Sequence, residues 1–148
     1  MKVPEQEPIQ ISFVRVLIVD DLEAWREFVI SRLQAMSDLH IVGTASDGVE
    51  AVRKAAELQP DLILLDVRLP RLNGIEAARQ IRELAPNCKI LFLSAESDAS
   101  VVQAAFDAGA SGFVLKLDAA KGLLAGMASV LLGRAFFSRG LMGPDGRT

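Results

Sequence analysis

Short runs of aliphatic residues alternate along the chain with longer segments in which apolar residues recur every three or four positions. The runs are nearly continuous in Val, Ile and Leu, which is typical of strands buried on both faces of a parallel sheet. They lie at residues 14–19, 41–45, 62–65, 89–93 and 112–115. The pattern therefore predicts five buried strands.

Each run is followed by a segment with the period of an amphipathic helix. One face of the first helix holds Leu22, Trp25, Phe28, Val29, Leu33 and Met36. Capping-box spacing marks the starts of the second and third helices, at Asp47 with Glu50 and at Asn73 with Glu76. The fourth and fifth helices are expected over about residues 99–108 and 119–132.

This alternation of strands and helices defines an α/β fold class. Strands joined by single helices must run parallel, because each crossover returns over the sheet in the right-handed sense. We therefore expect a five-stranded parallel doubly wound sheet of (βα)5 order within residues 12–139. Residues 1–11 are expected to be a flexible leader, and the Gly- and Pro-containing residues 140–148 a tail or the start of a linker.

Composition narrows the class of protein further. The 148 residues fit one domain, and 51% hydrophobic against 24% charged residues can bury a core. The longest charge-free apolar stretch, residues 122–133, is too short for a membrane span, which needs about 20 residues. A net charge of −3 gives no electrostatic footprint for nucleic acid or an anionic membrane. With a single cysteine and no signal-peptide pattern, a cytoplasmic location is expected.

Polar residues collect where the predicted strands end, which is the edge where open α/β sheets bind ligands. The strand ends carry Asp20-Asp21, Asp66, Ser94 and Lys116. Three neighbouring carboxylates repel one another, and Mg²⁺, which prefers hard oxygen ligands, relieves that repulsion. A lysine at the same edge adds a positive charge for a phosphoryl group. Taken singly, the acidic pair could be a helix cap and the lysine a solvated charge, but their shared edge indicates a site.

These residues stand in text that resembles the receiver domain of two-component response regulators over about residues 14–133. The matching text is LIVDD ending at Asp21, LILLDVRLPRLNGIEAARQIR around Asp66, LFLSA ending at Ala95 and AGASGFVLK ending at Lys116. The family's lysine is commonly followed by proline, whereas Leu117 follows here. This departure and the text GRAFFS at 133–138 are most similar to receivers of the NarL/FixJ type, which precede a helix-turn-helix DNA-binding domain.

The resemblance implies a flavodoxin-like receiver fold and a phosphorylation switch. Asp66 matches the aspartate that accepts a phosphoryl group from a sensor histidine kinase. Asp20 and Asp21, with Asp66 and the backbone carbonyl of Arg68, match the ligands of a Mg²⁺ cofactor. Lys116 matches the lysine that pairs with the phosphoryl oxygens.

Further residues match the family's switch and the mouth of its pocket. Ser94 matches the hydroxyl residue that turns inward to the phosphoryl group, and Phe113 matches the aromatic switch residue. The small Ala95 leaves room for the incoming group. Arg68 and Glu96 flank the mouth, and we expect their opposite charges to meet there.

The fifth predicted helix is richer in apolar residues than one buried stripe requires. The residues concerned are Leu123, Leu124, Met127, Val130, Leu131 and Leu132, with Phe136 and Phe137 beyond. We expect this surface, together with the fourth helix and the fifth strand, to change on phosphorylation and to contact a second copy or an output domain. The implied output is transcription regulation, with no direct contact of this chain to nucleic acid or membrane.

Other functions stay open at this point. A Mg²⁺-dependent phosphatase with an aspartate nucleophile, of the haloacid dehalogenase type, would have a second aspartate where this chain has Arg68. A flavodoxin-like cofactor binder would have Ser, Thr and Gly in place of Asp20 and Asp21. A stand-alone scaffold receiver would not need its acidic and cationic residues intact. We expect no enzyme activity beyond assistance to the chain's own phosphorylation and dephosphorylation.

Three uncommon residues are expected to be structural. Trp25 is predicted to be a partly buried helix residue without a direct signalling role. His40 is predicted to be a solvated residue at the start of the second strand. Cys88 is predicted to be a small packed residue at the start of the fourth strand.

Overall fold

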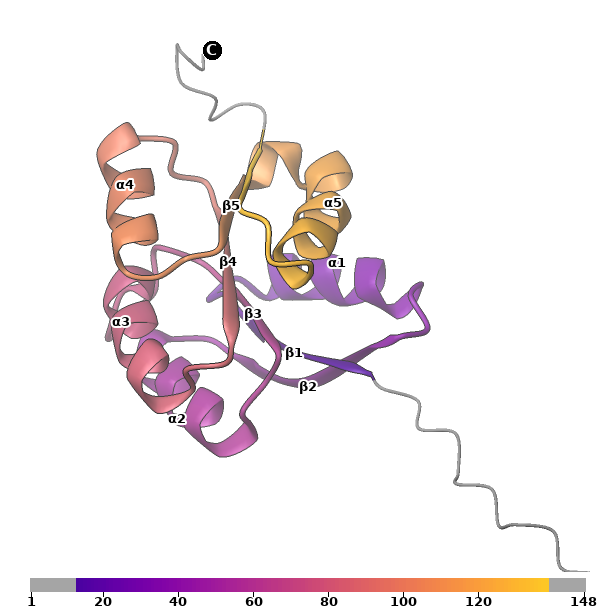
Figure 1. The fold of residues 1–148 in the computed structure, drawn as a ribbon, viewed down its shortest axis with the longest axis horizontal. Helices are drawn as coiled ribbons and strands as arrows, with labels where there is room; N and C mark the ends of the chain where they lie inside the picture. The colour runs from indigo at the N-terminus through magenta and orange to yellow at the C-terminus, as the bar shows by residue number, and fades with distance from the viewer. Residues whose placement is uncertain (1–12, 139–148) are drawn as a thin grey trace, which may run out of the picture.

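A parallel sheet lies between two layers of helices in the computed structural model, which describes residues 13–138 (Figure 1). The strand order is β2-β1-β3-β4-β5-β6, and every neighbouring pair is parallel. The strands are β1 (Val14–Val19), β2 (Leu39–Ala45), β3 (Leu62–Leu65), β4 (Lys89–Ser94), β5 (Gly112–Leu115) and β6 (Phe136–Phe137). The helices are α1 (Glu23–Gln34), α2 (Gly48–Leu58), α3 (Gly74–Leu84), α4 (Ala99–Asp107) and α5 (Ala119–Leu131), with a short 3₁₀ turn η1 (Lys116–Asp118).

The two faces of the sheet hold separate apolar clusters. Along β1, Leu17 belongs to the cluster under α2, α3 and α4, whereas Ile18 belongs to the cluster under α1 and α5. Alternate side chains of one strand therefore point to opposite helix layers, as a doubly wound sheet requires. The α/β class and the parallel, doubly wound architecture are confirmed. No helix within residues 13–138 is long and apolar enough to cross a membrane.

The sheet has six strands, and the expected count of five is corrected. Phe136 and Phe137 pair with Gly112 and Phe113 along the outer edge of β5. The pairing satisfies backbone groups that an edge strand otherwise leaves open. Gly126 of α5 allows the close approach, because a Cβ there would lie 3.0 Å from the ring of Phe136. A strand of two residues is too short to give a sequence pattern, so the prediction missed it.

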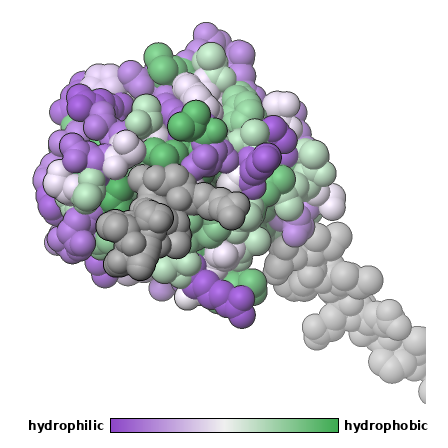
Figure 2. All heavy atoms as spheres, turned by 90° about the horizontal axis from the view of Figure 1, so that it is seen from above, coloured by the Kyte–Doolittle hydropathy of each residue, from purple (hydrophilic) through white to green (hydrophobic). Residues whose placement is uncertain are grey.

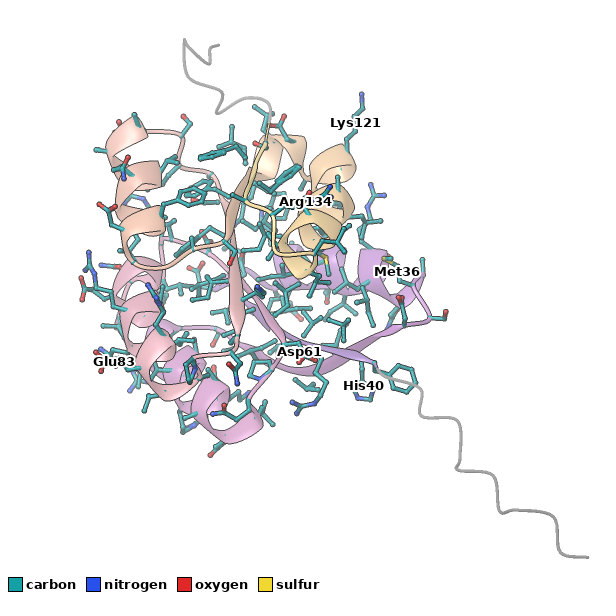
Figure 3. All side chains as sticks on the ribbon, in the orientation of Figure 1. Met36, His40, Asp61, Glu83, Lys121 and Arg134 are labelled. Carbon is teal, nitrogen blue, oxygen red and sulfur yellow. The ribbon has the colours of Figure 1, made fainter. Side chains whose placement is uncertain are left out.

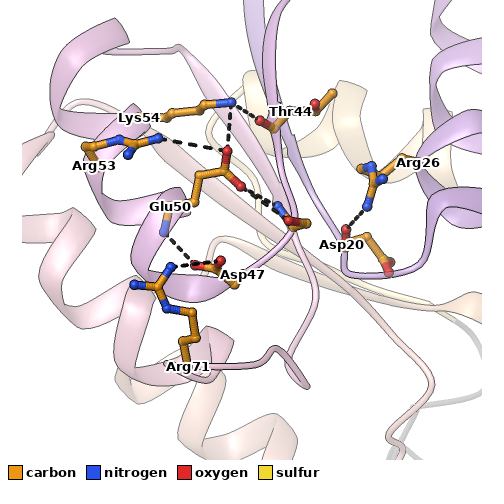
Figure 4. A network of polar contacts seen from close by, with 9 residues as sticks. Asp20, Arg26, Thr44, Asp47, Glu50, Arg53, Lys54 and Arg71 are labelled. Atoms are coloured by element: carbon orange, nitrogen blue, oxygen red, sulfur yellow. Dashed lines mark hydrogen bonds and ion pairs between the residues drawn. The ribbon is translucent and has the colours of Figure 1, made fainter.

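The predicted caps of α2 and α3 are present. The backbone N–H of Glu50 donates to Asp47 Oδ1 at 2.7 Å (Figure 4), and that of Glu76 donates to Asn73 Oδ1 at 3.0 Å. The return contact of a full capping box differs in α2, because the Glu50 carboxylate accepts from the backbone N–H of Ser46 at 2.9 Å. These caps fix the loops that follow β2 and β3.

The apolar surplus of α5 divides between core and surface. Leu123, Met127 and Val130 are buried, whereas Leu124 and Leu132 are 37% and 72% exposed. Figure 2 looks at the end of the molecule that lies at the top of Figure 1 and shows hydrophobic surface among the polar surface. Part of α5 therefore faces outward, as its sequence predicts.

The environments of two of the three uncommon residues match a structural role. His40 is exposed near the start of β2 and at the edge of the molecule, with its ring 6.1 Å from that of Phe13 (Figure 3). Cys88 is partly buried, and this burial, with a smaller effect from Asp61, raises the pKa of its thiol to about 12. The expected leader 1–11 and tail 140–148 lie outside the described residues.

Gly74 begins α3 against the backbone of the strand end that carries Asp66. A Cβ on Gly74 would lie 1.9 Å from the carbonyl oxygen of Asp66. Gly74→Ala is expected to lower the free energy of unfolding by about 1–3 kcal/mol, since main-chain atoms must move. Gly122→Ala is the control, because a Cβ there would have its nearest neighbour at 3.6 Å. The control is expected to stabilise by about 0.5–1 kcal/mol, and urea unfolding that gives both variants the same sign would contradict this account.

Candidate functional site

The topology brings the ends of β1 and β3 together. The backbone N–H of Asp66 donates to the carbonyl of Val19 at 3.1 Å, and that of Asp20 donates to the carbonyl of Ala45 at 3.1 Å. Sequence order reverses here, because β1 lies between β2 and β3 in the sheet. A crevice outside the strand ends at such a switch point is where open α/β sheets bind ligands.

Three carboxylates form a cluster at this crevice. Asp20, Asp21 and Asp66 each offer an oxygen, and these oxygens all lie within 4.8 Å of one another. Asp20 and Asp66 are 4% and 5% exposed, whereas Asp21 is exposed. Hard oxygen donors with one face open to water fit Mg²⁺, which keeps several of its own waters.

Lys116 provides the positive charge of the cluster. It follows β5, and its side chain extends past the end of β4 so that Nζ lies 2.8 Å from Asp20 Oδ2 and 3.0 Å from Asp66 Oδ2. Burial disfavours the charged ammonium, but the two carboxylates outweigh burial and raise the pKa of Lys116 above its ordinary value. The ammonium is therefore charged at neutral pH.

The pKa of Asp66 is raised to about 6. Burial is the largest cause, the hydrogen bond from Lys116 acts against it, and the negative charge of Asp20 adds to the rise. The cluster holds more negative charge than one ammonium balances, so a divalent cation near Asp66 would favour the ionised carboxylate.

The mouth of the crevice is a groove of about 690 Å³ whose lining includes Asp21, Arg68 and Glu96. Arg68 and Glu96 form an ion pair through the arginine Nε, as their charges predict. The backbone N–H of Arg68 also lies 3.4 Å from Asp66 Oδ1, which brings the main chain of Arg68 beside the cluster. Ala95 is exposed between β4 and α4 and adds no bulk beyond its methyl group.

The two residues matched to the switch are buried. Ser94 ends β4, and its Oγ accepts a hydrogen bond from the backbone N–H of Glu96 at 3.0 Å. Phe113 is fully buried in β5, with its ring stacked 5.8 Å from that of Phe92. Ser94 and Phe113 thus lie on neighbouring strands, β4 and β5.

Sequence reasoning missed two residues that contact the site or its switch strand. The ring of Trp25 lies 4.9 Å from Lys116 Nζ, although Trp25 is partly buried as predicted. Lys116 lies far from Trp25 in the sequence, so no local spacing revealed this contact. Ser138 is the second, because its backbone N–H donates to the carbonyl of Phe113 at 2.9 Å and its Oγ accepts from the N–H of Leu115 at 3.1 Å.

A cluster of carboxylates and one lysine at the carboxyl ends of a flavodoxin-like parallel sheet is typical of a phosphoacceptor signalling domain. A sequence model of the response regulator receiver domain matches residues 16–127. The chain belongs to this family of receiver domains.

Several of the similar proteins are response regulators of the LuxR and NarL type. The response regulator protein VraR of Staphylococcus aureus is 37% identical over 124 residues, which is 84% of this chain. A LuxR-family two-component response regulator from Aurantimonas has 34% identity and a TM-score of 0.82, covering 88% of this chain and 93% of the solved chain. The signal receiver domain of NarL from Mycobacterium tuberculosis has 31% identity and a TM-score of 0.78, covering 83% and 99%. The similarity to NarL-type receivers is confirmed.

The match to curated relatives is partial in length. The chain spans 59% of the length of VraR and 47% of the length of the transcriptional regulatory protein LnrK of Bacillus subtilis.

Mg²⁺ is expected to stabilise the fold, because a ligand that binds only the native state raises its stability. Asp21→Asn should abolish most of the rise in melting temperature that millimolar Mg²⁺ gives. Asp21 is exposed, so the variant should fold normally. Asp38→Asn, an exposed carboxylate before β2, is the control and should keep the full rise. The same metal-induced rise in Asp21→Asn would remove Asp21 from the metal site.

Proposed function

We propose that this chain is a cytoplasmic phosphoacceptor whose Asp66 takes a phosphoryl group from a sensor histidine kinase in the presence of Mg²⁺. The observation that carries the proposal is the pairing of Asp66 Oδ2 with Lys116 Nζ at 3.0 Å inside a cluster of three carboxylates. Membership of the receiver family supports it. Asp20, Asp21, Asp66 and the backbone carbonyl of Arg68 would hold the metal.

The reaction needs positioning and charge compensation more than covalent help from the protein. A carboxylate oxygen of Asp66 forms a bond to phosphorus, and the bond between phosphorus and the kinase's histidine nitrogen breaks as the imidazole leaves. Lys116, already within hydrogen-bond distance of Asp66, pairs with the phosphoryl oxygens. Bound Mg²⁺ supplies further positive charge to those oxygens.

The residue two positions after Asp66 argues against a phosphatase acting on other substrates. That position holds Arg68, which cannot act as the general acid and base that a second aspartate provides, and Arg68 is paired with Glu96. We propose that this pair hinders water from reaching the phosphoryl group, so that it affects the lifetime of the phosphorylated state. The pair is partly exposed and contributes little to folding stability.

The proposed output begins at the phosphoryl group. Ser94 turns toward the phosphoryl oxygens, which frees space that Phe113 then fills. The backbone carbonyl of Phe113 accepts a hydrogen bond from the backbone N–H of Ser138. In the sheet, Phe113 pairs with Phe137 of β6. The ring of Phe137 lies 4.6 Å from that of Phe106 in α4, so β6 connects the switch strand to α4 and to the chain that follows.

We propose α4, β5, β6 and α5 as the output surface. Exposed apolar side chains of this region, at Leu124, Leu132 and Phe137, fit contact with a second copy or an output domain. The proposed receiver spans residues 12–139, with a leader before it and a tail or the start of a linker after it. Control of transcription is the proposed result of this contact.

Phosphorylation is tested with acetyl phosphate and Mg²⁺, followed by intact-mass analysis. The wild-type chain should gain one phosphoryl group, and Asp66→Asn should gain none because the acceptor carboxylate is gone. Asp38→Asn is the control and should be phosphorylated like the wild type. Label that persists in Asp66→Asn would move the acceptor to another residue.

The output surface is tested by hydrogen exchange and sedimentation with and without beryllofluoride, a phosphoryl mimic. Exchange should change in α4, β5, β6 and α5, and α2 should serve as the internal control with no change. Self-association should increase, since a switch transmits only if its two states bind a partner with different affinity. Unchanged exchange in all four elements together with unchanged sedimentation would contradict the assignment.

A further inference from the structure

The first turn of α1 contacts the candidate site at two consecutive residues. Trp25 lies with its ring 4.9 Å from Lys116 Nζ, and Arg26 donates from Nη1 to the backbone carbonyl of Asp20 at 2.7 Å (Figure 4 shows the second contact). The backbone N–H of Leu22 also donates to Asp20 Oδ1 at 3.0 Å. The start of α1 therefore contacts the residues of the candidate site and also packs against the core.

The ammonium of Lys116 has an unusual set of partners. Its Nζ lies 2.8 Å from Asp20 Oδ2 and 3.0 Å from Asp66 Oδ2, and its side chain is only 9% exposed. The face of Trp25 covers another side of the same ammonium, within the range of about 6 Å in which an aromatic ring attracts a cation. Little of the Lys116 ammonium is exposed to solvent, so its attraction to the Trp25 ring is only weakly screened by water.

We propose that Trp25 is a positioning residue that holds Lys116 against Asp66. The inference rests on the function proposed above and adds to it a residue that does not touch the phosphoryl group. Asp20 competes with Asp66 for the ammonium, and a metal held by Asp20 would draw that carboxylate away from Lys116. Trp25 is a neutral partner, so its attraction for the ammonium persists when the charges around Asp20 change.

The ring also limits where the flexible lysine chain can go. A lysine side chain has four rotatable bonds and loses much rotamer freedom when it is fixed. The Trp25 ring is itself fixed, because Phe28 packs edge-on against it with ring centroids 5.2 Å apart. A fixed ring beside the ammonium reduces the number of lysine conformers that miss Asp66.

The rate test compares two replacements of Trp25 with a matched control. Trp25→Leu removes the aromatic face and should lower the rate of phosphorylation by acetyl phosphate by about three- to tenfold. Trp25→Phe keeps an aromatic face and should recover most of that loss. Phe13→Leu is the control, because the Phe13 ring contacts His40 instead of Lys116, and this variant should stay within about twofold of the wild type. Melting curves identify any variant that fails to fold.

An optical test separates positioning from packing. Trp25 is the single tryptophan of the chain, so its emission reports on this contact alone. Without metal or phosphodonor, Lys116→Ala should shift the Trp25 emission, because a charge next to the indole is removed. Adding Mg²⁺ and beryllofluoride should change the emission of the wild type and not that of Lys116→Ala.

The outcomes distinguish this inference from the function on which it rests. If the wild type is phosphorylated and Trp25→Leu is phosphorylated at the same rate, the role of Trp25 alone is overturned. Identical Trp25 emission in the wild type and Lys116→Ala would overturn it as well. Failure of the wild type to be phosphorylated would overturn the proposed function, and the metal-free emission test would still decide whether Trp25 and Lys116 are coupled. A slow Trp25→Leu, a recovered Trp25→Phe and a shifted emission together support the inference.

Discussion

Two nearly buried carboxylates, Asp20 and Asp66, share one ammonium at the carboxyl ends of a parallel sheet. Buried like charges repel strongly unless a cation lies between or beside them, and the rest of the site is arranged around this constraint. The strand order supplies the closeness of the two aspartates, and Lys116 supplies part of the compensation. The negative charge that remains uncompensated is the electrostatic basis on which we propose that Mg²⁺, and then a phosphoryl group, bind at this place.

The same constraint links the site to the surface that lies farther along the sheet. Lys116 directly follows β5, and the backbone of β5 is bonded to Ser138 at Phe113 and Leu115. We propose that a change in the charge near Asp66 acts on β5, whose other edge carries β6. In this proposal, η1 and the aromatic contacts of β6 connect the charge cluster to α4.

The sequence was enough to predict the elements whose pattern is regular and local. Continuous aliphatic runs predicted β1 to β5, and Asp47 and Asn73 predicted helix starts that the structure confirms. The convergence of Asp20, Asp66 and Lys116 followed from topology, since parallel strands end at one edge. The roles of these residues came from the family resemblance and stay predictions.

The contacts that sequence reasoning missed depend on tertiary packing. β6 forms because Gly126 leaves space for Phe136 beside an open edge, which two phenylalanines do not reveal as a pattern. Trp25 was interpreted as a helix residue because its partner, Lys116, lies far away in sequence. Such pairs are set by how α1 and the η1 turn after β5 meet at the carboxyl end of the sheet, and no local spacing encodes that.

The electrostatic cost of ionised Asp66 in the metal-free protein is the property on which the proposed site depends most directly. Its folded pKa of about 6 lies above the ordinary value of 3.8, so the folded state holds this proton more tightly than the unfolded state. The contribution of Asp66 to stability must therefore fall as pH rises through this interval. The test is the free energy of unfolding of the wild type and Asp66→Asn in EDTA between about pH 4 and pH 7. We expect Asp66→Asn to be the more stable at pH 7, with the difference shrinking toward pH 4. A variant that is less stable at pH 7, or a difference independent of pH, would contradict the account.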